Sequence, residues 1–332
     1  MKRIFILIHI CIIISSCTNL PHIREENEIV YIVGIHGREA VYWVNGKENI
    51  LPRLNNSAAA YDILISGSDI YIIGHDGSEA VYWLNGQRNL LSDDIIGYDF
   101  SFNQYKIGLS GSDLYVVGGY DFINLRYEAV YFLKGKRYVL PSSNMASAYN
   151  IKLLGSDVYI VGYDGYNAVY WLNDNLNILL KDNEKAKAVD IAISGSDIYI
   201  IGDDGSEAVY WLNGKKYVLC ENGNTYAIQI NGSDIYIVGC VDDDAVYWLN
   251  GMKYILPKNS EGAYAIDIAF NNNDVYILGY DSLNIVYWLN GKLYNLLDED
   301  LNEYFNNIDW DNININNIIE RNVRCFSIKI VH

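Results

Sequence analysis

The chain has 332 residues, of which 41 are Asp or Glu and 24 are Lys or Arg, so its formal net charge at pH 7 is −17. An acidic excess of this size argues against nucleic acid and against an anionic lipid surface as partners, because both attract basic patches. The five cysteines are too few for a disulfide framework, and the sequence contains no Cys-x-x-Cys and no His/Cys pair at the spacing of a metal site.

The first 17 residues have the composition of a signal. The basic start MKR precedes the apolar run IFILIHICIII, and SSC follows that run directly. A helix that spans a bilayer needs about 20 apolar residues, so this run is too short to be a permanent anchor. The segment therefore predicts an exported protein.

The order apolar, small, small, Cys resembles the lipobox of bacterial lipoproteins. The resemblance implies that residues 1–16 are a signal peptide and that Cys17 is acylated and becomes the mature N-terminus. Residues 17–27 would then be the lipidated cysteine and a linker, and the body would be extracytoplasmic, held at the bacterial cell envelope only through the lipid. Thr18 after the cysteine favours the outer membrane if the cell has one. In the alternative, an ordinary secretory peptide, Cys17 is incidental.

From residue 28 to 297 the chain repeats one unit seven times, with a period of 37 to 40 residues and one interval of 49. The first half of the unit is typified by GSDIYIIG at 67–74. The second half, AVYWLNG or a close variant, stands at 40–46, 80–86, 129–135, 168–174, 208–214, 245–251 and 285–291. Periods of 20 to 50 residues indicate solenoids, propellers or arrays.

Each unit resolves into four short strands, as in AVDIAIS, DIYIIG, EAVYWLN and KKYVL between 188 and 219. Asn-Gly joins the third and fourth strands in five of the seven units, which predicts type I′ turns because both central residues need positive φ. Gly-Ser-Asp joins the first and second strands. Four antiparallel strands per repeat predict an all-β fold, a seven-bladed β-propeller, over residues 28–332.

The first unit lacks its first strand, and the C-terminus supplies a candidate. CFSIKIV at 325–331 matches the pattern of YNIKLL at 149–154. We therefore expect the last strand to pair into the first blade and close the ring, and we expect a monomer. Residues 298–323 break the period and are predicted to be an irregular insertion before the closing strand.

The Tyr-Trp-x-Asn-Gly hairpins are similar to those of bacterial β-propeller proteins, and more loosely to kelch repeats. A kelch repeat has a double glycine after its second strand, which occurs here only at Gly118-Gly119. The resemblance implies a fold and no particular activity.

The turns between the second and third strands vary while the rest of the unit is uniform, which predicts a binding face. Its candidate residues are Asp76, Glu79, Asp121, Arg126, Asp164, Asp203, Asp204, Glu207, Asp242, Asp243, Asp244 and Asp281. The alternative is that these are solvated turn residues. Asp242–Asp244 is a weak calcium candidate, because hard cations prefer carboxylate oxygens, although it lacks the spacing of a calcium loop; no other cofactor is expected.

Two further groups stand out. Aligned on their turns, the first strands place polar residues at one position, predicted to be the mouth of the central channel on the side of the variable turns: Asp62, Lys106, Asn150, Asp190 and Asp267. Such a ring could bind a ligand or only hydrate the channel. Cys220 and Cys240 are predicted near the same side, either as a disulfide or as free thiols.

Two repeated residues are predicted to be structural. The Asp of the Gly-Ser-Asp turns forms the turn, and the Trp of Tyr-Trp belongs to the core. The tryptophans are Trp43, Trp83, Trp171, Trp211, Trp248 and Trp288, with Phe132 in the seventh place.

No Ser-His-Asp or metal triad can be assembled from the spacing of motifs. We therefore predict a binding or interaction module at the cell envelope, with an unknown protein or glycan as partner. One alternative is a propeller-based glycan lyase or hydrolase with its site at the channel mouth. The other is a structural component of an envelope assembly.

Overall fold

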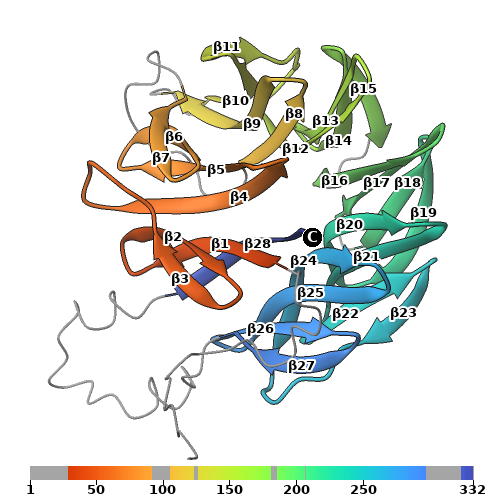
Figure 1. The fold of residues 1–332 in the computed structure, drawn as a ribbon. Coiled ribbons are helices and arrows are strands. Elements are labelled where there is room, and N and C mark those ends of the chain that lie inside the picture. Colours follow the sequence, from red (N-terminus) through yellow and green to blue (C-terminus); the bar gives the residue numbers. More distant parts are fainter. Residues whose placement is uncertain are drawn as a thin grey trace, which may run out of the picture.

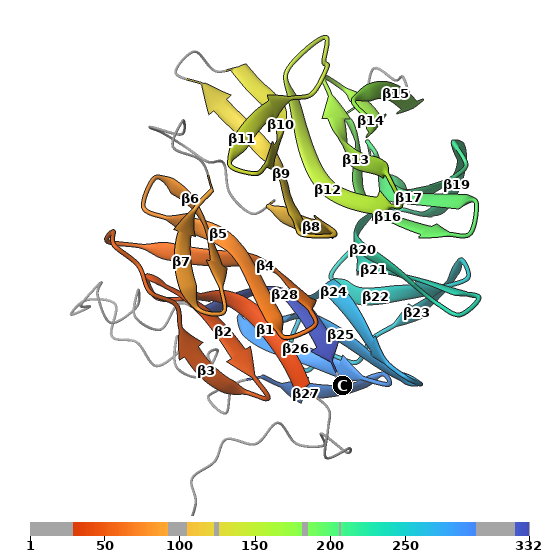
Figure 2. The same cartoon turned by 45° about the horizontal axis from the view of Figure 1, so that its top comes forward.

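A computed structural model of the chain describes residues 29–91, 105–122, 126–180, 185–205, 207–296 and 323–331. These residues form seven sheets of four antiparallel strands and no helix. The sheets stand side by side in a ring, and the first strand of each blade lines the centre (Figures 1 and 2). The predicted seven-bladed β-propeller is confirmed.

The strands of each blade follow from the centre outward. Blade 1 contains β28 (Val323–Val331), β1 (Ile29–His36), β2 (Glu39–Val44) and β3 (Lys47–Ile50). Blade 2 contains β4 (Ala58–Ser66), β5 (Asp69–Asp76), β6 (Glu79–Leu84) and β7 (Gln87–Leu90). Blade 3 contains β8 (Lys106–Ser110), β9 (Asp113–Phe122), β10 (Arg126–Leu133) and β11 (Lys136–Val139). Blade 4 contains β12 (Ala146–Leu154), β13 (Asp157–Asp164), β14 (Asn167–Leu172) and β15 (Asn175–Leu180).

The remaining three blades have the same order. Blade 5 contains β16 (Ala186–Ser194), β17 (Asp197–Asp204), β18 (Glu207–Leu212) and β19 (Lys215–Glu221). Blade 6 contains β20 (Gly223–Asn231), β21 (Asp234–Val241), β22 (Asp244–Leu249) and β23 (Met252–Ile255). Blade 7 contains β24 (Ala263–Asn271), β25 (Asp274–Asp281), β26 (Asn284–Leu289) and β27 (Lys292–Asn295). We call the side with the turns between second and third strands the variable face, and the side with the Gly-Ser-Asp and Asn-Gly turns the hairpin face.

The hairpin face is built from one repeated pair of turns. Asn85 and Gly86 have φ of 52° and 80°, the values that a type I′ turn requires. The Asn85 side chain accepts a hydrogen bond from the Ile70 N–H at 2.9 Å and donates one to the Asp69 carboxylate at 2.9 Å. The same Asn–Asp bond recurs in four more blades. The repeated Asp is therefore structural, and it ties two neighbouring turns together.

The tryptophan of each unit is core, as predicted. All six are at most 1% exposed, and Phe132 replaces them in blade 3. Three of the indoles also bind the connection that enters their own blade, because their Nε1–H donates to a proline carbonyl. These pairs are Trp83 with Pro52 (2.8 Å), Trp171 with Pro141 (2.7 Å) and Trp288 with Pro257 (2.7 Å).

Tyrosines form ladders across the blades. In blade 6 the Tyr247 ring lies between those of Tyr236 and Tyr254, with centroids 6.4 and 5.0 Å away. Stacked cross-strand aromatic pairs add to the stability of a sheet. Blades 3 and 7 carry equivalent ladders. This arrangement accounts for much of the tyrosine content of the chain.

The ring closes where the C-terminal strand enters blade 1. Strand β28 pairs antiparallel with β1 from Ile29 opposite Val331 to His36 opposite Val323, so the predicted closure is confirmed. It is anchored to blade 7 by the Tyr280 hydroxyl, which donates to the Cys325 carbonyl (3.0 Å) and accepts from the Cys325 N–H (2.8 Å).

Two features refine the predicted organisation. The segment 119–128, which lengthens the third unit and accounts for the interval of 49 residues, is largely an extension of the hairpin, since Arg126 pairs with Phe122 at the tips of β10 and β9. The predicted insertion at 298–323 ends one residue earlier, because β28 begins at Val323; the rest of it lies outside the described residues.

The predicted signal, Cys17 and the linker also lie outside the described residues. None of the chain that the structure describes forms a helix long and apolar enough to cross a bilayer.

We predict that Tyr280→Phe destabilises the protein through the closure. The substitution leaves the buried N–H and C=O of Cys325 without their partner, which costs about 2–4 kcal/mol of unfolding free energy. Guanidinium denaturation of the purified protein measures this change. Tyr264→Phe is the matched control, because the Tyr264 hydroxyl bonds to no described residue; its effect should stay within about 0.5 kcal/mol. Equal denaturation midpoints for the two variants would show that the hydrogen bonds of the Tyr280 hydroxyl do not stabilise the closure of the ring.

Candidate functional site

The polar ring of the channel arises from a bulge repeated in the inner strands. The pairing of the inner strand with its neighbour skips one residue in six of the seven blades, for example Tyr61 between Ala60 and Asp62. A bulge re-aims the side chains that follow it. The residue after the bulge is the position of the predicted ring, and Lys106 occupies it at the start of β8.

The ring carboxylates link neighbouring blades. Each of three aspartates accepts a hydrogen bond from a backbone N–H of the next inner strand: Asp62 from Ile107 (3.2 Å), Asp190 from Ile228 (2.8 Å) and Asp267 from Ile328 (3.0 Å). Lys106 Nζ lies 3.5 Å from Asp62 Oδ1, and the Asn150 amide donates to Asp190. The residues that the sequence placed at one equivalent position are therefore in contact between neighbouring blades.

The position of the ring differs from the prediction. Asp62 pairs with Ile73 in the middle of β4, whereas Ala58 at the start of that strand pairs with Asp76 on the variable face. The bulge adds a residue above the ring, so the ring lies inside the channel and below its mouth. Its carboxylates fasten blades to one another.

Burial sets the ionisation of the ring. Loss of solvent raises the pKa of Asp190 from 3.8 to about 6. Burial would also raise the pKa of Asp267, but Lys329, Lys106 and the bonds from Ile328 and Ser327 outweigh it and hold that pKa below its usual value. Burial opposes the charge of Lys106, yet the surrounding carboxylates raise its pKa.

Three acids of the predicted binding face are part of the scaffold. Asp76, Asp164 and Asp281 are at most 3% exposed, and the two oxygens of each accept hydrogen bonds from consecutive backbone N–H groups of the connection into the same blade. For Asp76 these donors are Leu54 and Asn55, at 2.7 and 2.9 Å. Their assignment to an exposed binding face is therefore wrong: they cap the connections between blades.

Most of the other acids are paired with a basic side chain. Arg88 binds Asp76 and Glu79, and Lys216 binds Asp204 and Glu207 in the same way from the outer strand of its blade. Asp203 lies 3.0 Å from Lys187 and Asp244 lies 2.8 Å from Lys258. The variable face is thus far less negative than its sequence suggests.

Two acids remain. Asp242 and Asp243 are exposed, and their carboxylates make no hydrogen bond or ion pair with any described residue. Asp121 and Arg126 lie in β9 and β10, but their side chains are outside the described part of the structure.

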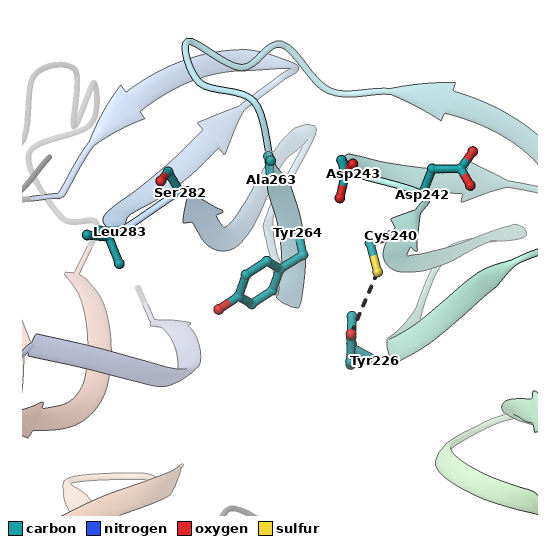
Figure 3. Close-up of a pocket in the computed structure, with 9 residues that line it drawn as sticks. Tyr226, Cys240, Asp242, Asp243, Ala263, Tyr264, Ser282 and Leu283 are labelled. Atoms are coloured by element: carbon teal, nitrogen blue, oxygen red, sulfur yellow. Dashed lines mark hydrogen bonds between the residues drawn. The ribbon is translucent and has the colours of Figure 1, made fainter.

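Asp242 and Asp243 line a pocket on the variable face between blades 6 and 7. Its volume is about 380 Å³, and Figure 3 shows Asp243 facing the cavity while the Asp242 carboxylate points away from it. The other lining residues are Tyr226, Cys240, Gly262, Ala263, Tyr264, Ser282 and Leu283. Among the described residues, no three His, Cys, Asp or Glu side chains are grouped so as to hold a metal ion.

The aromatic wall of the pocket is held in place. Tyr264 stacks on Tyr280, with ring centroids 4.9 Å apart, and the Tyr280 hydroxyl is fixed by the backbone of β28. The Tyr226 hydroxyl lies 3.7 Å from the Cys240 sulfur. Tyr226 and Tyr264 are nevertheless 38% and 39% exposed, so their rings form a firm surface that is open to solvent.

These two tyrosines were missed in the sequence. Tyr226 occupies the same bulge position as Tyr61 and Tyr149, so nothing distinguished it from them. Tyr264 stands where blade 2 has Ala59, and that departure from the repeat was the available signal.

Cys220 and Cys240 are free thiols in the structure, the second of the two alternatives that the sequence left open, and Cys325 is a buried thiol. Burial raises the pKa of Cys220, which lowers its reactivity as a thiolate.

No family model matches this chain, and no curated protein matches it. Solved structures do resemble it. One is a puromycin-hydrolysing peptidase of Mycobacterium tuberculosis, 10% identical, with a TM-score of 0.56 over 82% of this chain and 52% of that one. Another is the computationally designed protein Ika8, 14% identical, with a TM-score of 0.48 over 81% of this chain and 83% of that one. The match spans about half the length of the peptidase, and at such identities it shows the fold alone.

We predict that Asp190→Asn makes the protein relatively more stable as the pH rises. A carboxyl with a raised pKa in the folded state opposes folding once it ionises, so the penalty is absent below pH 3.8 and complete above about pH 6. The unfolding free energy of the variant minus that of the wild type should increase by about 2 kcal/mol between pH 4 and pH 7.

Urea denaturation across this pH range measures the difference. Asp267→Asn is the matched control: because the pKa of Asp267 is lowered in the folded protein, its difference from the wild type should stay nearly constant between pH 4 and pH 7 and change, with the opposite sign, only below about pH 3.8. Loss of the carboxylate oxygen can add a constant cost to the unfolding free energy of Asp190→Asn, and this cost does not depend on pH. A difference between variant and wild type that stays the same from pH 4 to pH 7 would contradict the argument that burial raises the pKa of Asp190.

Proposed function

We propose that the protein is a lipid-anchored binding module of the bacterial cell envelope, which contacts its partner through the pocket between blades 6 and 7. The propeller fold fits a binding or interaction module. One observation carries the choice of site. Of the acids predicted for the binding face whose side chains are described, only Asp242 and Asp243 lack a hydrogen-bond or ion-pair partner, and both line this pocket.

The two faces of the ring support this division. On the hairpin face the repeated Asn–Asp bonds use the polar side chains of the turns to hold the blades' own hairpins. On the variable face the turns differ from blade to blade, and Tyr226, Tyr264 and Leu283 expose aromatic or aliphatic surface beside the pocket. A rigid scaffold with variation on one side is the usual arrangement of a binding protein.

The envelope location rests on the N-terminal sequence. The short apolar run followed by Ser15, Ser16 and Cys17 resembles a signal peptide that ends in a lipobox, and this resemblance supports the proposal. Stable attachment needs more than one acyl chain, each buried methylene adding about 0.8 kcal/mol.

We predict that Leu283→Arg disrupts partner binding and that Ser68→Arg does not. Both changes add one positive charge at an exposed turn residue, the first at the pocket and the second on the hairpin face. Quantitative cross-linking of intact envelopes, followed by affinity purification of the full chain, should show at least a fivefold loss of adducts for Leu283→Arg only. Equal adduct yields for wild type and Leu283→Arg would exclude the pocket.

We predict that Cys17→Ser releases the protein from membranes, because the thiol that would carry the lipid is gone. Labelling with radioactive palmitate and fractionation of cells measure both effects. Cys11→Ser, in the apolar run, is the matched control and should stay labelled and membrane-bound. A Cys17→Ser protein that remains labelled in the membrane fraction would overturn the lipid anchor.

A further inference from the structure

The pocket between blades 6 and 7 combines three features in one place. Its volume of about 380 Å³ is at the lower end of the range for small-ligand sites. Its wall contains the exposed rings of Tyr226 and Tyr264, whose centroids are 6.5 Å apart and whose planes are inclined by 52°. Its rim contains the unpartnered carboxylate of Asp243 (Figure 3).

The Asp243 carboxylate is exposed and makes no hydrogen bond or ion pair with the described residues. The backbone carbonyl of Asp243 accepts hydrogen bonds from the Ala263 N–H (2.9 Å) and from Lys258 Nζ (2.8 Å), so its main chain is fixed across the two blades. Lys258 is already paired with Asp244 at 2.8 Å. The Asp243 side chain is therefore left to interact with a group from outside.

The charge and the rings select the same kind of ligand. A carboxylate attracts a cation, and the faces of tyrosine rings attract one through their quadrupoles. Asp242 on the same turn and the net charge of −17 add a long-range attraction for basic partners.

The apolar part of the lining indicates what the cation is attached to. Leu283 is 50% exposed at the rim, and with the two rings it offers a surface for an aliphatic stem. Lysine and arginine carry their charge on such a stem and bury it against apolar surface while the head stays polar. The Ser282 hydroxyl, on the Leu283 side of the pocket, supplies a further acceptor for an N–H donor, which a quaternary ammonium lacks.

We propose that this pocket binds a cationic side chain, lysine or arginine, of a protein partner. The proposal rests on the proposed function and adds the chemical class of the ligand. A single side chain held by one carboxylate and two rings binds weakly, with a Kd of about 1 mM, so a partner would need further contacts on the variable face.

The test uses the full chain in a non-ionic detergent and ligand-observed saturation-transfer NMR. The probes are the blocked amino acids Nα-acetyl-lysine methylamide and Nα-acetyl-arginine methylamide. Their neutral counterparts, the Nε-acetyl-lysine and citrulline derivatives, have similar stems without the charge. We expect one or both cationic probes to bind and the neutral ones to bind at least tenfold more weakly. The two cationic probes then distinguish a lysine from an arginine.

Two pairs of variants localise the contact. Asp243→Asn should raise the Kd of the cationic probe about tenfold, whereas Asp242→Asn, which removes the same charge from a side chain pointing away, should change it less than twofold. Tyr264→Leu should weaken binding severalfold and Tyr264→Phe, which keeps the ring, should not.

Three results would overturn the proposal: neutral and cationic probes that bind alike, equal losses in the two Asp variants, or binding of choline or glucosamine in place of both cationic probes. None of these results would bear on the proposed function, which fails only if Leu283→Arg leaves the cross-linked partner unchanged. If Leu283→Arg abolishes partner binding but the cationic probes do not bind, the pocket is still the binding site, and the proposed ligand class is wrong.

Discussion

Each blade of this protein is a sheet that is apolar on both faces, and this constraint governs the rest of the molecule. In a strand such as β6 the buried side chains of Val81 and Trp83 lie on one side of the sheet and Ala80 on the other. A sheet of this kind needs a neighbour on each side to stay out of water. A closed ring is the arrangement that gives every blade two neighbours, and it makes the pairing of β28 with β1 essential.

Polar residues inside such a ring have two uses. Asp62, Asp190 and Asp267 each bind a backbone N–H of the next blade, so they add polar connections between sheets whose packed faces are apolar. On the hairpin face the Asn and Asp of adjacent turns bind each other. Buried or bound in this way, a carboxylate stabilises the fold and is withdrawn from contact with a ligand.

On the variable face, most carboxylates are likewise used to stabilise the fold, and few remain for a ligand. Its connections between blades have backbone N–H groups that no strand satisfies, and buried aspartates supply the acceptors. Its outer strands supply basic side chains such as Arg88 and Lys216 to the neighbouring acids. In the turn between β21 and β22 the equivalent of Asp76 is Val241, so this turn has no capping carboxylate, and Asp242 and Asp243 remain exposed. The proposed site lies where the repeat departs from its own pattern.

The sequence alone determined the number of blades, the four-stranded unit, the type I′ turns, the core tryptophans and the closing strand. These features could be predicted because each repeat specifies them locally, in alternating side chains and turn residues that are adjacent in the chain. Only the tertiary structure decided which acids are free. Asp76 accepts hydrogen bonds from the backbone of Leu54 and Asn55, and Tyr264 stacks on Tyr280. Each of these contacts joins segments that are separate in the chain. The repeat predicts that such segments lie at the same edge of a blade, but it does not predict which side chains touch there. The bulge also moved the channel ring inward, and a one-residue shift of this kind leaves no mark in a pattern of alternating residues.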